Sequence, residues 1–227
     1  MSKNTSYKKE NIKLIAFDVD GTLFSSEGII LDTYIESIQR FIKKSNQSIP
    51  IPTKEKIIEQ IGLPVKQIFL NLLPQLLEEE RDEISDNVLN LLREKISYKQ
   101  GKIYDDVEST IATIAKKGYH LCVASNGRIG YIEAILNAYE LTSYFEPVSV
   151  INYTTIKSKG DIIKNYLEKY NLAGSNILMV GDRKSDLDAA LDNNAFFAFC
   201  EYGHADPNEV TIYDLKLTQF RDLLDYI

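Results

Sequence analysis

The sequence predicts an α/β fold, a doubly wound parallel sheet with an inserted α-helical domain. In the second half of the chain, short apolar runs alternate with helical stretches, which is typical of a parallel sheet covered by helices. The first apolar run stops at acidic residues and a glycine, as a buried strand does at the edge where ligands gather. Residues 18–119 separate this run from the next, which is far more than one crossover helix needs.

Five apolar runs are predicted to form the strands of the sheet. They cover residues 12–17, 120–124, 148–151, 177–180 and 195–200. Each run is short and nearly continuous, as strands buried on both faces are, and polar clusters follow the first four. Because ligands bind outside the carboxyl ends of such strands, these clusters are expected to meet at one edge of the sheet.

The long insertion is predicted to be a helical cap domain over residues 24–100, with the catalytic core formed by residues 1–23 and 101–227. Apolar residues recur with the helical period between residues 31 and 42 and again between residues 84 and 96. Asp105 followed by Glu108 resembles a capping box that opens a helix over residues 107–117, so the chain should have returned to the core by that point.

Composition narrows the classes of function. The formal net charge of -7 and the pI near 5.0 disfavour non-specific nucleic-acid binding, which draws on clustered Lys and Arg. Residues 1–13 are polar and do not read as a secretion signal, and no run reaches transmembrane length, so a cytoplasmic location and no membrane partner are expected. Cys122 and Cys200 each lie in an apolar run and are expected to be buried hydrophobes.

The first polar cluster, Asp18-Val19-Asp20-Gly21-Thr22, supplies a candidate nucleophile. Asp18 and Asp20 are two residues apart and face the same side if the strand stays extended, while Gly21 permits a sharp turn beside a ligand. A carboxylate such as Asp18 can attack phosphorus without prior deprotonation and form an aspartyl-phosphate. Asp20 would protonate the leaving group and later deprotonate water. The alternative is a plain turn rich in Asp and Gly.

Two further clusters offer groups that bind phosphate. Ser125, Asn126 and Gly127 end the second predicted strand, where a hydroxyl and successive backbone N–H groups can hold phosphate oxygens, although the same residues also make an ordinary turn. Lys159 stands at the start of a predicted helix, where its ammonium and the helix N-terminus would compensate a phosphate. Lys157 is close enough to compete for this role.

The fourth cluster, residues 181–186, follows the predicted strand 177–180 and offers ligands for a metal. Asp182 and Asp186 supply hard oxygen atoms, and Mg²⁺ is commonly held by one or two carboxylates together with water and substrate phosphate. Mg²⁺ is therefore the expected cofactor. The alternative is a turn that caps the following helix.

These clusters together resemble the haloacid dehalogenase-like (HAD) superfamily, and within it the phosphatases with an α-helical cap, such as phosphoglycolate phosphatase-like enzymes. The resemblance covers nearly the whole chain after residue 11 and implies a Rossmann-like core. It implies Asp18 as nucleophile and metal ligand, and Asp20 as acid and base and, through its backbone carbonyl, a metal ligand. It also implies that Ser125 and Lys159 bind phosphate, that Asp182 ligates Mg²⁺, and that Asp186 ligates the metal or orients its shell.

The expected activity is Mg²⁺-dependent hydrolysis of a small-molecule phosphomonoester through an aspartyl-phosphate. Dehalogenases similar to this chain lack the carboxylate that corresponds to Asp20, which argues against dehalogenation. Related phosphomutases carry a hinge histidine where this chain has Ile30, which favours water as the second nucleophile. A sugar phosphomutase resembling β-phosphoglucomutase and a non-catalytic phospholigand-binding protein remain the alternatives.

Substrate choice is expected to depend on the cap. Gly62, Leu63 and Pro64 lie between two predicted helices and resemble the cap loop that, in similar enzymes, reaches over the active site; a plain helix–helix turn is the alternative. Arg128 could bind a second anionic group, or it could be an exposed arginine. The physiological substrate and the choice between monomer and homodimer stay open.

Overall fold

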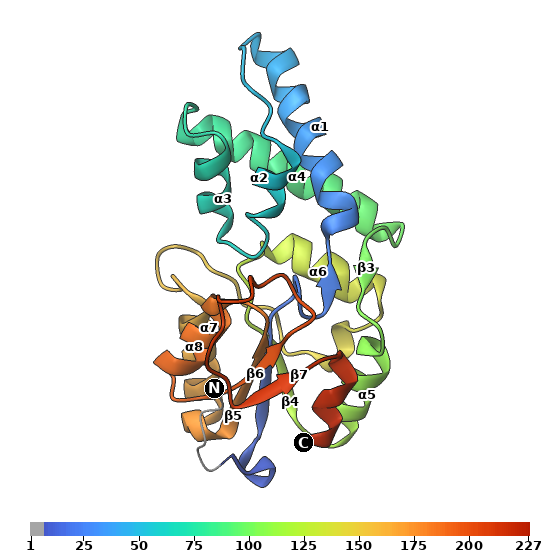
Figure 1. Ribbon diagram of the computed structural model, residues 1–227, viewed down its shortest axis with the longest axis vertical. Helices are drawn as coiled ribbons and strands as arrows, with labels where there is room; N and C mark the ends of the chain where they lie inside the picture. Colours follow the sequence, from blue (N-terminus) through green and yellow to red (C-terminus); the bar gives the residue numbers. More distant parts are fainter. Residues whose placement is uncertain (1–6) are drawn as a thin grey trace.

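The computed structural model describes residues 7–227. Residues 1–6, which begin the polar N-terminal segment and the predicted core, lie outside the described residues. Within the described part, a parallel sheet covered by helices forms one region and a group of helices stands above the carboxyl edge of that sheet (Figure 1). No described helix combines the length and the apolar character that crossing a membrane requires.

The central sheet has five parallel strands and confirms the predicted fold class. Its order is β4-β1-β5-β6-β7. The strands are β1 (Leu14–Phe17), β4 (His120–Val123), β5 (Ile177–Gly181), β6 (Phe196–Cys200) and β7 (Leu215–Leu217). In the middle of the sheet, Ala16 of β1 lies between Cys122 of β4 and Met179 of β5. All three are fully buried, which explains why the strands are continuously apolar.

Helices cover both faces of the sheet. On one face pack α5 (Val107–Lys116), α6 (Ile129–Ala138) and the 3₁₀ helix η4 (Phe220–Asp225). On the other face pack α7 (Lys159–Tyr170) and α8 (Lys184–Asp192). Short 3₁₀ turns complete the core: η1 (Lys9–Asn11), η2 (Thr142–Tyr144) and η3 (Gly174–Asn176). Successive apolar side chains of β1, β4, β5 and β6 therefore enter two different apolar clusters, as the doubly wound arrangement requires.

The prediction of a strand at residues 148–151 is wrong, because this segment has no regular secondary structure. The chain comes beside β4 through one backbone bond, from Glu146 N to Leu121 O at 2.8 Å. Pro147 follows and has no N–H with which to continue a ladder. Val148 and Ile151 still pack against the apolar clusters on the two faces, so hydrophobicity alone produced the strand-like pattern.

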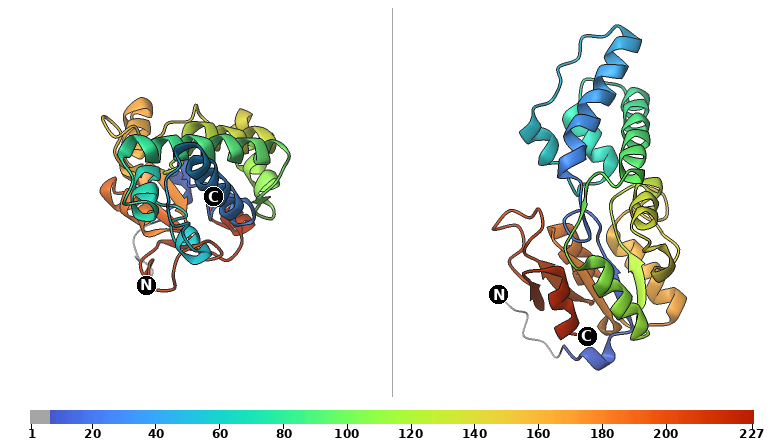
Figure 2. Two further views of the ribbon diagram at one scale, coloured as in Figure 1. Left: turned by 90° about the horizontal axis from the view of Figure 1, so that it is seen from above. Right: turned by 90° about the vertical axis from the view of Figure 1, so that its right-hand side faces the viewer.

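The inserted segment consists of four helices and leaves the core at a two-stranded antiparallel ladder. The helices are α1 (Glu27–Ser45), α2 (Lys54–Ile58), α3 (Val65–Leu72) and α4 (Glu78–Ser97), and the ladder pairs β2 (Phe24–Ser25) with β3 (Lys102–Ile103). Helix α4 packs against α1 and also against α6 of the core. The side view in Figure 2 shows these helices above the sheet. The domain boundaries at residues 24 and 100 stay a prediction.

The prediction of a capping box formed by Asp105 and Glu108 at the start of α5 is wrong. The N-cap residue is Asp106, which has a left-handed conformation with φ 63° and makes no capping hydrogen bond through its side chain. A capping box needs an extended N-cap residue, and the carboxylate of Asp105 lies instead 3.2 Å from the Lys102 ammonium. A capping box does occur at α7, where Ser158 and Asp161 satisfy each other's backbone N–H groups.

Candidate functional site

The polar clusters predicted from the sequence converge at the carboxyl edge of the sheet. Asp18 follows β1 directly, Ser125 follows β4 by two residues, and Asp182 follows β5 directly. Lys159 begins α7, and Asp186 lies in the first turn of α8, so both come from the face that these two helices cover. The convergence follows from the topology, because parallel strands end at the same edge.

A buried ion cluster lies at the centre of this edge. The Lys159 ammonium is 2.8 Å from Asp18 Oδ2 and 2.6 Å from Asp186 Oδ1. Burial by itself would lower the pKa of the Lys159 ammonium, but the charges of Asp18 and Asp186 outweigh burial and hold that pKa above its ordinary range. Lys159 is 3% exposed, whereas Lys157 is exposed, so Lys159 is the lysine that reaches the carboxylates.

Asp182 completes a group of three carboxylates. One oxygen each from Asp18, Asp182 and Asp186 lies within 4.8 Å of the other two. Asp182 Oδ2 accepts a hydrogen bond of 2.6 Å from the backbone N–H of His204. A Cβ atom at Gly21 would overlap the Asp182 carboxylate, and the φ of 77° at Gly21 also favours glycine. The motif glycine therefore allows the first loop to approach the third carboxylate.

The pKa values of the Asp182 and Asp186 carboxyls lie above their ordinary range, because both groups are buried close to other negative charges. Burial, together with the nearby Asp18 carboxylate, raises the pKa of the Asp182 carboxyl to about 7. Burial also raises the pKa of the Asp186 carboxyl to about 8, although the Lys159 ammonium acts in the opposite direction. Three carboxylates share one ammonium, so a hard divalent cation such as Mg²⁺ fits both the oxygen donors and the charge.

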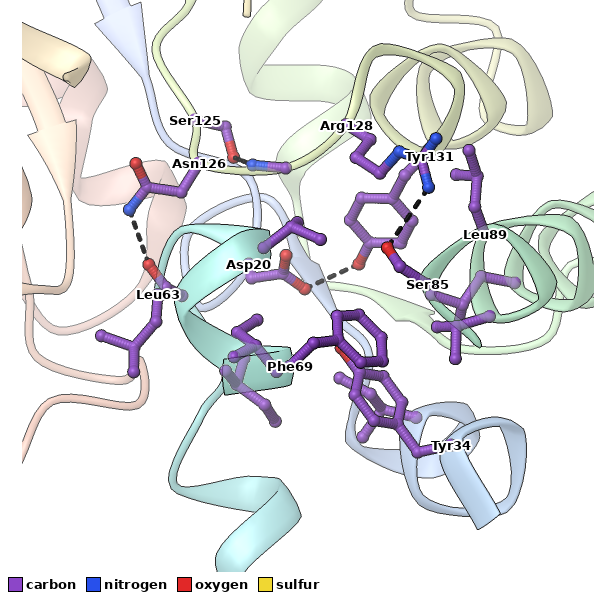
Figure 3. Close-up of a pocket in the computed structure, with 18 of the residues that line it drawn as sticks. Asp20, Tyr34, Leu63, Phe69, Ser85, Leu89, Ser125, Asn126, Arg128 and Tyr131 are labelled. Carbon is purple, nitrogen blue, oxygen red and sulfur yellow. Dashed lines mark hydrogen bonds between the residues drawn. The ribbon is translucent and has the colours of Figure 1, made fainter. Parts of the chain in front are cut away.

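The Asp20 carboxylate is not part of this group and lines a chamber between the core and the inserted helices. Asp20 Oδ1 accepts hydrogen bonds from the hydroxyls of Ser26 at 2.8 Å and Tyr131 at 2.7 Å. Burial raises the pKa of the Asp20 carboxyl above its ordinary range, while these two hydrogen bonds oppose the rise. Figure 3 shows Asp20 with the Tyr131 hydroxyl pointing at it. Asp18 lines the same chamber.

Ser125 and Asn126 line the chamber beside Asp18. Ser125 is 2% exposed, and its Oγ accepts a bond of 3.2 Å from the N–H of Gly127, which leaves the hydroxyl proton able to donate. The Asn126 side chain instead donates from Nδ2 to the carbonyl oxygen of Gly62 at 2.8 Å. Asn126, expected to bind phosphate, thus joins the core to the inserted segment.

The loop between α2 and α3 lies over the site and is held by two core side chains. Besides the bond from Asn126, the guanidinium of Arg183 donates from Nη1 to the carbonyl oxygen of Ile61 at 2.9 Å and from Nε to Glu209 at 2.8 Å. Gly62 and Leu63 line the chamber with Asp20. Pro64 is the N-cap residue of α3 and is not among the lining residues.

Arg128 also lines the chamber, but its guanidinium already has partners in α4. Nη1 donates to Ser85 Oγ at 3.3 Å (Figure 3). Nη2 lies 2.7 Å from Asp86 Oδ1. The side chain is 37% exposed. Arg128 therefore connects the core to α4, and any second anionic group would have to compete with Asp86 for it.

Sequence reasoning missed three residues that position the site: Ser26, Tyr131 and Arg183. Ser26 and Tyr131 bind Asp20, and Arg183 holds the loop that contains Gly62. Tyr131 is separated from Asp20 by 111 residues and lies within an ordinary amphipathic helix, so no local pattern marks it. Arg183 belongs to the cluster that follows β5, but its partner Ile61 is apolar and offers only a backbone carbonyl.

Comparison with known proteins identifies similar chains over nearly the whole length. The family model described as haloacid dehalogenase-like hydrolase matches residues 12–193. A phosphoglycolate phosphatase of Aliivibrio fischeri is 27% identical over 227 aligned residues, which cover 95% of this chain and 96% of that protein.

Two crystal structures illustrate the shared fold. A structure described as a predicted phosphatase from Clostridium acetobutylicum has a TM-score of 0.77 and 24% identity, and the match covers 94% of this chain and 97% of that one. A structure described as a predicted phosphoglycolate phosphatase from Haemophilus somnus has a TM-score of 0.76 and 23% identity, with coverage of 95% and 97%. At these identities the likeness establishes the fold.

Adding Mg²⁺ to metal-free protein is expected to raise the melting temperature, because the cation offsets the repulsion among Asp18, Asp182 and Asp186. An ion that binds only the folded state at about 100 times its Kd stabilises that state by about 2.7 kcal/mol. In Asp182→Asn the rise should shrink markedly while the metal-free melting temperature is kept or increased. Thermal melts with EDTA and with Mg²⁺ measure both quantities. An undiminished Mg²⁺ effect in Asp182→Asn would contradict the assignment of this site.

The stabilisation by Mg²⁺ is expected to be larger near pH 8.5 than near pH 6. The pKa of the Asp182 carboxyl is about 7 and that of Asp186 about 8 in the metal-free fold, so protonation at these positions stabilises the fold below these values and this stability is lost as pH rises. Mg²⁺ needs the ionised carboxylates, and protons compete with it. Melts at both pH values test this, and a larger Mg²⁺ effect at the lower pH would be the contrary result.

Proposed function

Because the chain belongs to the haloacid dehalogenase-like hydrolases, we propose that it is a Mg²⁺-dependent phosphatase that hydrolyses a small-molecule phosphomonoester through an aspartyl-phosphate. One observation carries the proposal. The Asp18 carboxylate lies at the polar end of a chamber, 2.8 Å from a buried ammonium and beside two further carboxylates. A carboxylate nucleophile, a cation and a metal-binding group are what phosphoryl transfer to an aspartate needs.

In the first step an Asp18 carboxylate oxygen attacks phosphorus, and the bond from phosphorus to the leaving-group oxygen breaks. The Asp20 carboxyl gives its proton to that oxygen, so an alcohol departs and Asp18 carries the phosphoryl group. The raised pKa of the Asp20 carboxyl favours the protonated form that this step requires. Ser26 and Tyr131 keep Asp20 aimed into the chamber.

In the second step water attacks phosphorus, and the bond from phosphorus to the Asp18 oxygen breaks. The Asp20 carboxylate takes a proton from that water, which returns both aspartates to their starting forms and releases inorganic phosphate. Water is favoured over a sugar hydroxyl because Ile30, a buried apolar residue that lines the chamber, stands where the related phosphomutases carry a histidine.

Phosphate binding is assigned to Lys159 and Ser125, with Asn126 in a supporting role. The Lys159 ammonium lies beside the nucleophile, and the Ser125 hydroxyl proton is free to donate to a phosphate oxygen. Mg²⁺, held by Asp18, Asp182, the backbone carbonyl of Asp20 and Asp186, would offset negative charge on the phosphoryl group. Asn126 acts through the carbonyl of Gly62, because its amide is already bound there.

The inserted helices are proposed to act as a cap, residues 24–100, over a core formed by residues 1–23 and 101–227. Support comes from the position of Gly62 and Leu63, which line the chamber with Asp20. A loop held there by Asn126 and Arg183 keeps bulk water from the reacting atoms and limits the substrate to a small molecule.

Asp18→Asn is expected to reduce phosphate release to background while the fold is retained, because Asn keeps the shape but is not an anionic nucleophile. Release of inorganic phosphate from a panel of phosphomonoesters with Mg²⁺ measures this, and circular dichroism checks folding. The matched control is Asp32→Asn, an exposed aspartate of α1. Near-normal turnover in Asp18→Asn would refute the assignment of Asp18 as the nucleophile. If the wild-type protein isomerises a phosphosugar without releasing inorganic phosphate, it is a mutase.

Asp20→Asn is expected to lower kcat on alkyl phosphates by about 10²–10⁴-fold, the usual contribution of general acid–base catalysis. The rate at which p-nitrophenyl phosphate forms the aspartyl-phosphate should fall much less, because nitrophenolate leaves without a proton. Single-turnover assays with both esters separate the two steps. Equal losses in the first step with both esters would argue against Asp20 as the general acid.

A further inference from the structure

The chamber above Asp18 and Asp20 has two chemically different ends. One end is lined by Asp18, Asp20, Ser125 and Asn126, and the phosphoryl group would react there. Most of the remaining wall comes from the inserted helices and the loop between α2 and α3, and it is largely apolar, although Ser85 of α4 and Arg128 and Tyr131 of the core also line the chamber. Its members include Tyr34, Ile61, Leu63, Ile68, Phe69 and Leu92. The rings of Tyr34 and Phe69 are stacked, with centroids 5.4 Å apart and planes 4° apart, so two aromatic side chains pack against each other in this wall.

The apolar end lacks a free positive charge. Arg128 is the one basic residue among the described residues that line the chamber, and it is paired with Asp86 and Ser85. Lys159 lies at the opposite end and is bound by Asp18 and Asp186. A leaving group with its own carboxylate would therefore enter an apolar space without a free counter-charge, and would lie near Asp20, which is costly.

The chamber also offers few hydrogen-bonding groups to a sugar. The hydroxyls of Ser26 and Tyr131 already donate to Asp20, and the amide of Asn126 donates to Gly62. Among the residues of the far wall, the hydroxyls of Tyr34 and Ser85 remain, and Ser85 already accepts a bond from Arg128. A polyhydroxylated leaving group would bury several hydroxyls without partners, which weakens binding.

We propose that the leaving group of the substrate is apolar, so that the enzyme acts on monophosphate esters of small hydrophobic alcohols. This inference rests on the proposed phosphatase function and names the class of substrate for that site. The phosphoryl group meets Asp18, Lys159 and Ser125, and the hydrocarbon part contacts the wall formed by α1, α3 and α4. Each methylene group buried there is expected to raise kcat/KM about fourfold until the chamber is filled.

The decisive comparison is between isobutyl phosphate and 2-phosphoglycolate, which have the same number and branching of heavy atoms in the leaving group and differ by a carboxylate. With wild-type protein and Mg²⁺, kcat/KM for phosphate release should be at least about tenfold higher for isobutyl phosphate. The value of kcat/KM should rise from ethyl to butyl to hexyl phosphate, and it should be low for glucose 6-phosphate. Alkyl esters avoid the faster leaving groups of aryl esters.

A charge placed in the chamber tests the same inference from the protein side. Leu89 is a partly buried α4 residue of the chamber wall, labelled in Figure 3. In Leu89→Arg the ratio of kcat/KM for isobutyl phosphate to that for 2-phosphoglycolate should fall by at least about tenfold, because the new cation compensates the carboxylate. Leu191→Arg makes the same change at an exposed position of α8 outside the chamber and should keep the wild-type ratio.

The outcomes separate this inference from the proposed function. If wild-type protein prefers 2-phosphoglycolate or glucose 6-phosphate and Asp18→Asn is inactive, the phosphatase function holds and the apolar leaving group is refuted. If no ester releases phosphate above the Asp18→Asn background, both fail. A folded Leu89→Arg with an unchanged ratio would also overturn the inference, and the wild-type ratio decides alone if that variant does not fold.

Discussion

Three buried carboxylates around one buried ammonium are the constraint on which the rest of the site depends. Asp18, Asp182 and Asp186 carry up to three negative charges against the single positive charge of Lys159, and all four side chains are almost completely excluded from water. Burial of an uncompensated charge costs free energy, so the group either takes up protons or binds a cation. The fold thus holds a site whose charge balance is incomplete until something positive enters it.

The topology explains how these charges come together. Strands β1 and β5 are neighbours, so the residues that follow them, Asp18 and Asp182, end side by side. Helices α7 and α8 pack together on one face, so the starts of both helices bring Lys159 and Asp186 to the same edge. Gly21 completes the arrangement, because a side chain there would collide with Asp182. Each charged residue thus lies in or next to a strand or helix that is held in place by its buried apolar side chains.

The inserted helices are tied to this edge by the core's own side chains. Asn126 and Arg183 bind two successive backbone carbonyls, of Gly62 and Ile61, and α4 packs on α6. The chamber that results has a charged floor from the core and a largely apolar wall from the insertion. The buried carboxylates and most of the apolar wall therefore come from different parts of the chain.

The sequence by itself determined the fold class and four of the five strands, because apolar runs are local signals, but it missed the short strand β7. It also predicted the polar residues that follow the strands. It misplaced a strand at residues 148–151, where hydrophobicity persists but Pro147 ends the ladder. It could not choose between Lys157 and Lys159, nor find Tyr131 as the partner of Asp20. Only the tertiary structure decided these contacts and the apolar character of the chamber, because they depend on which distant side chains meet, and neither spacing nor composition records that.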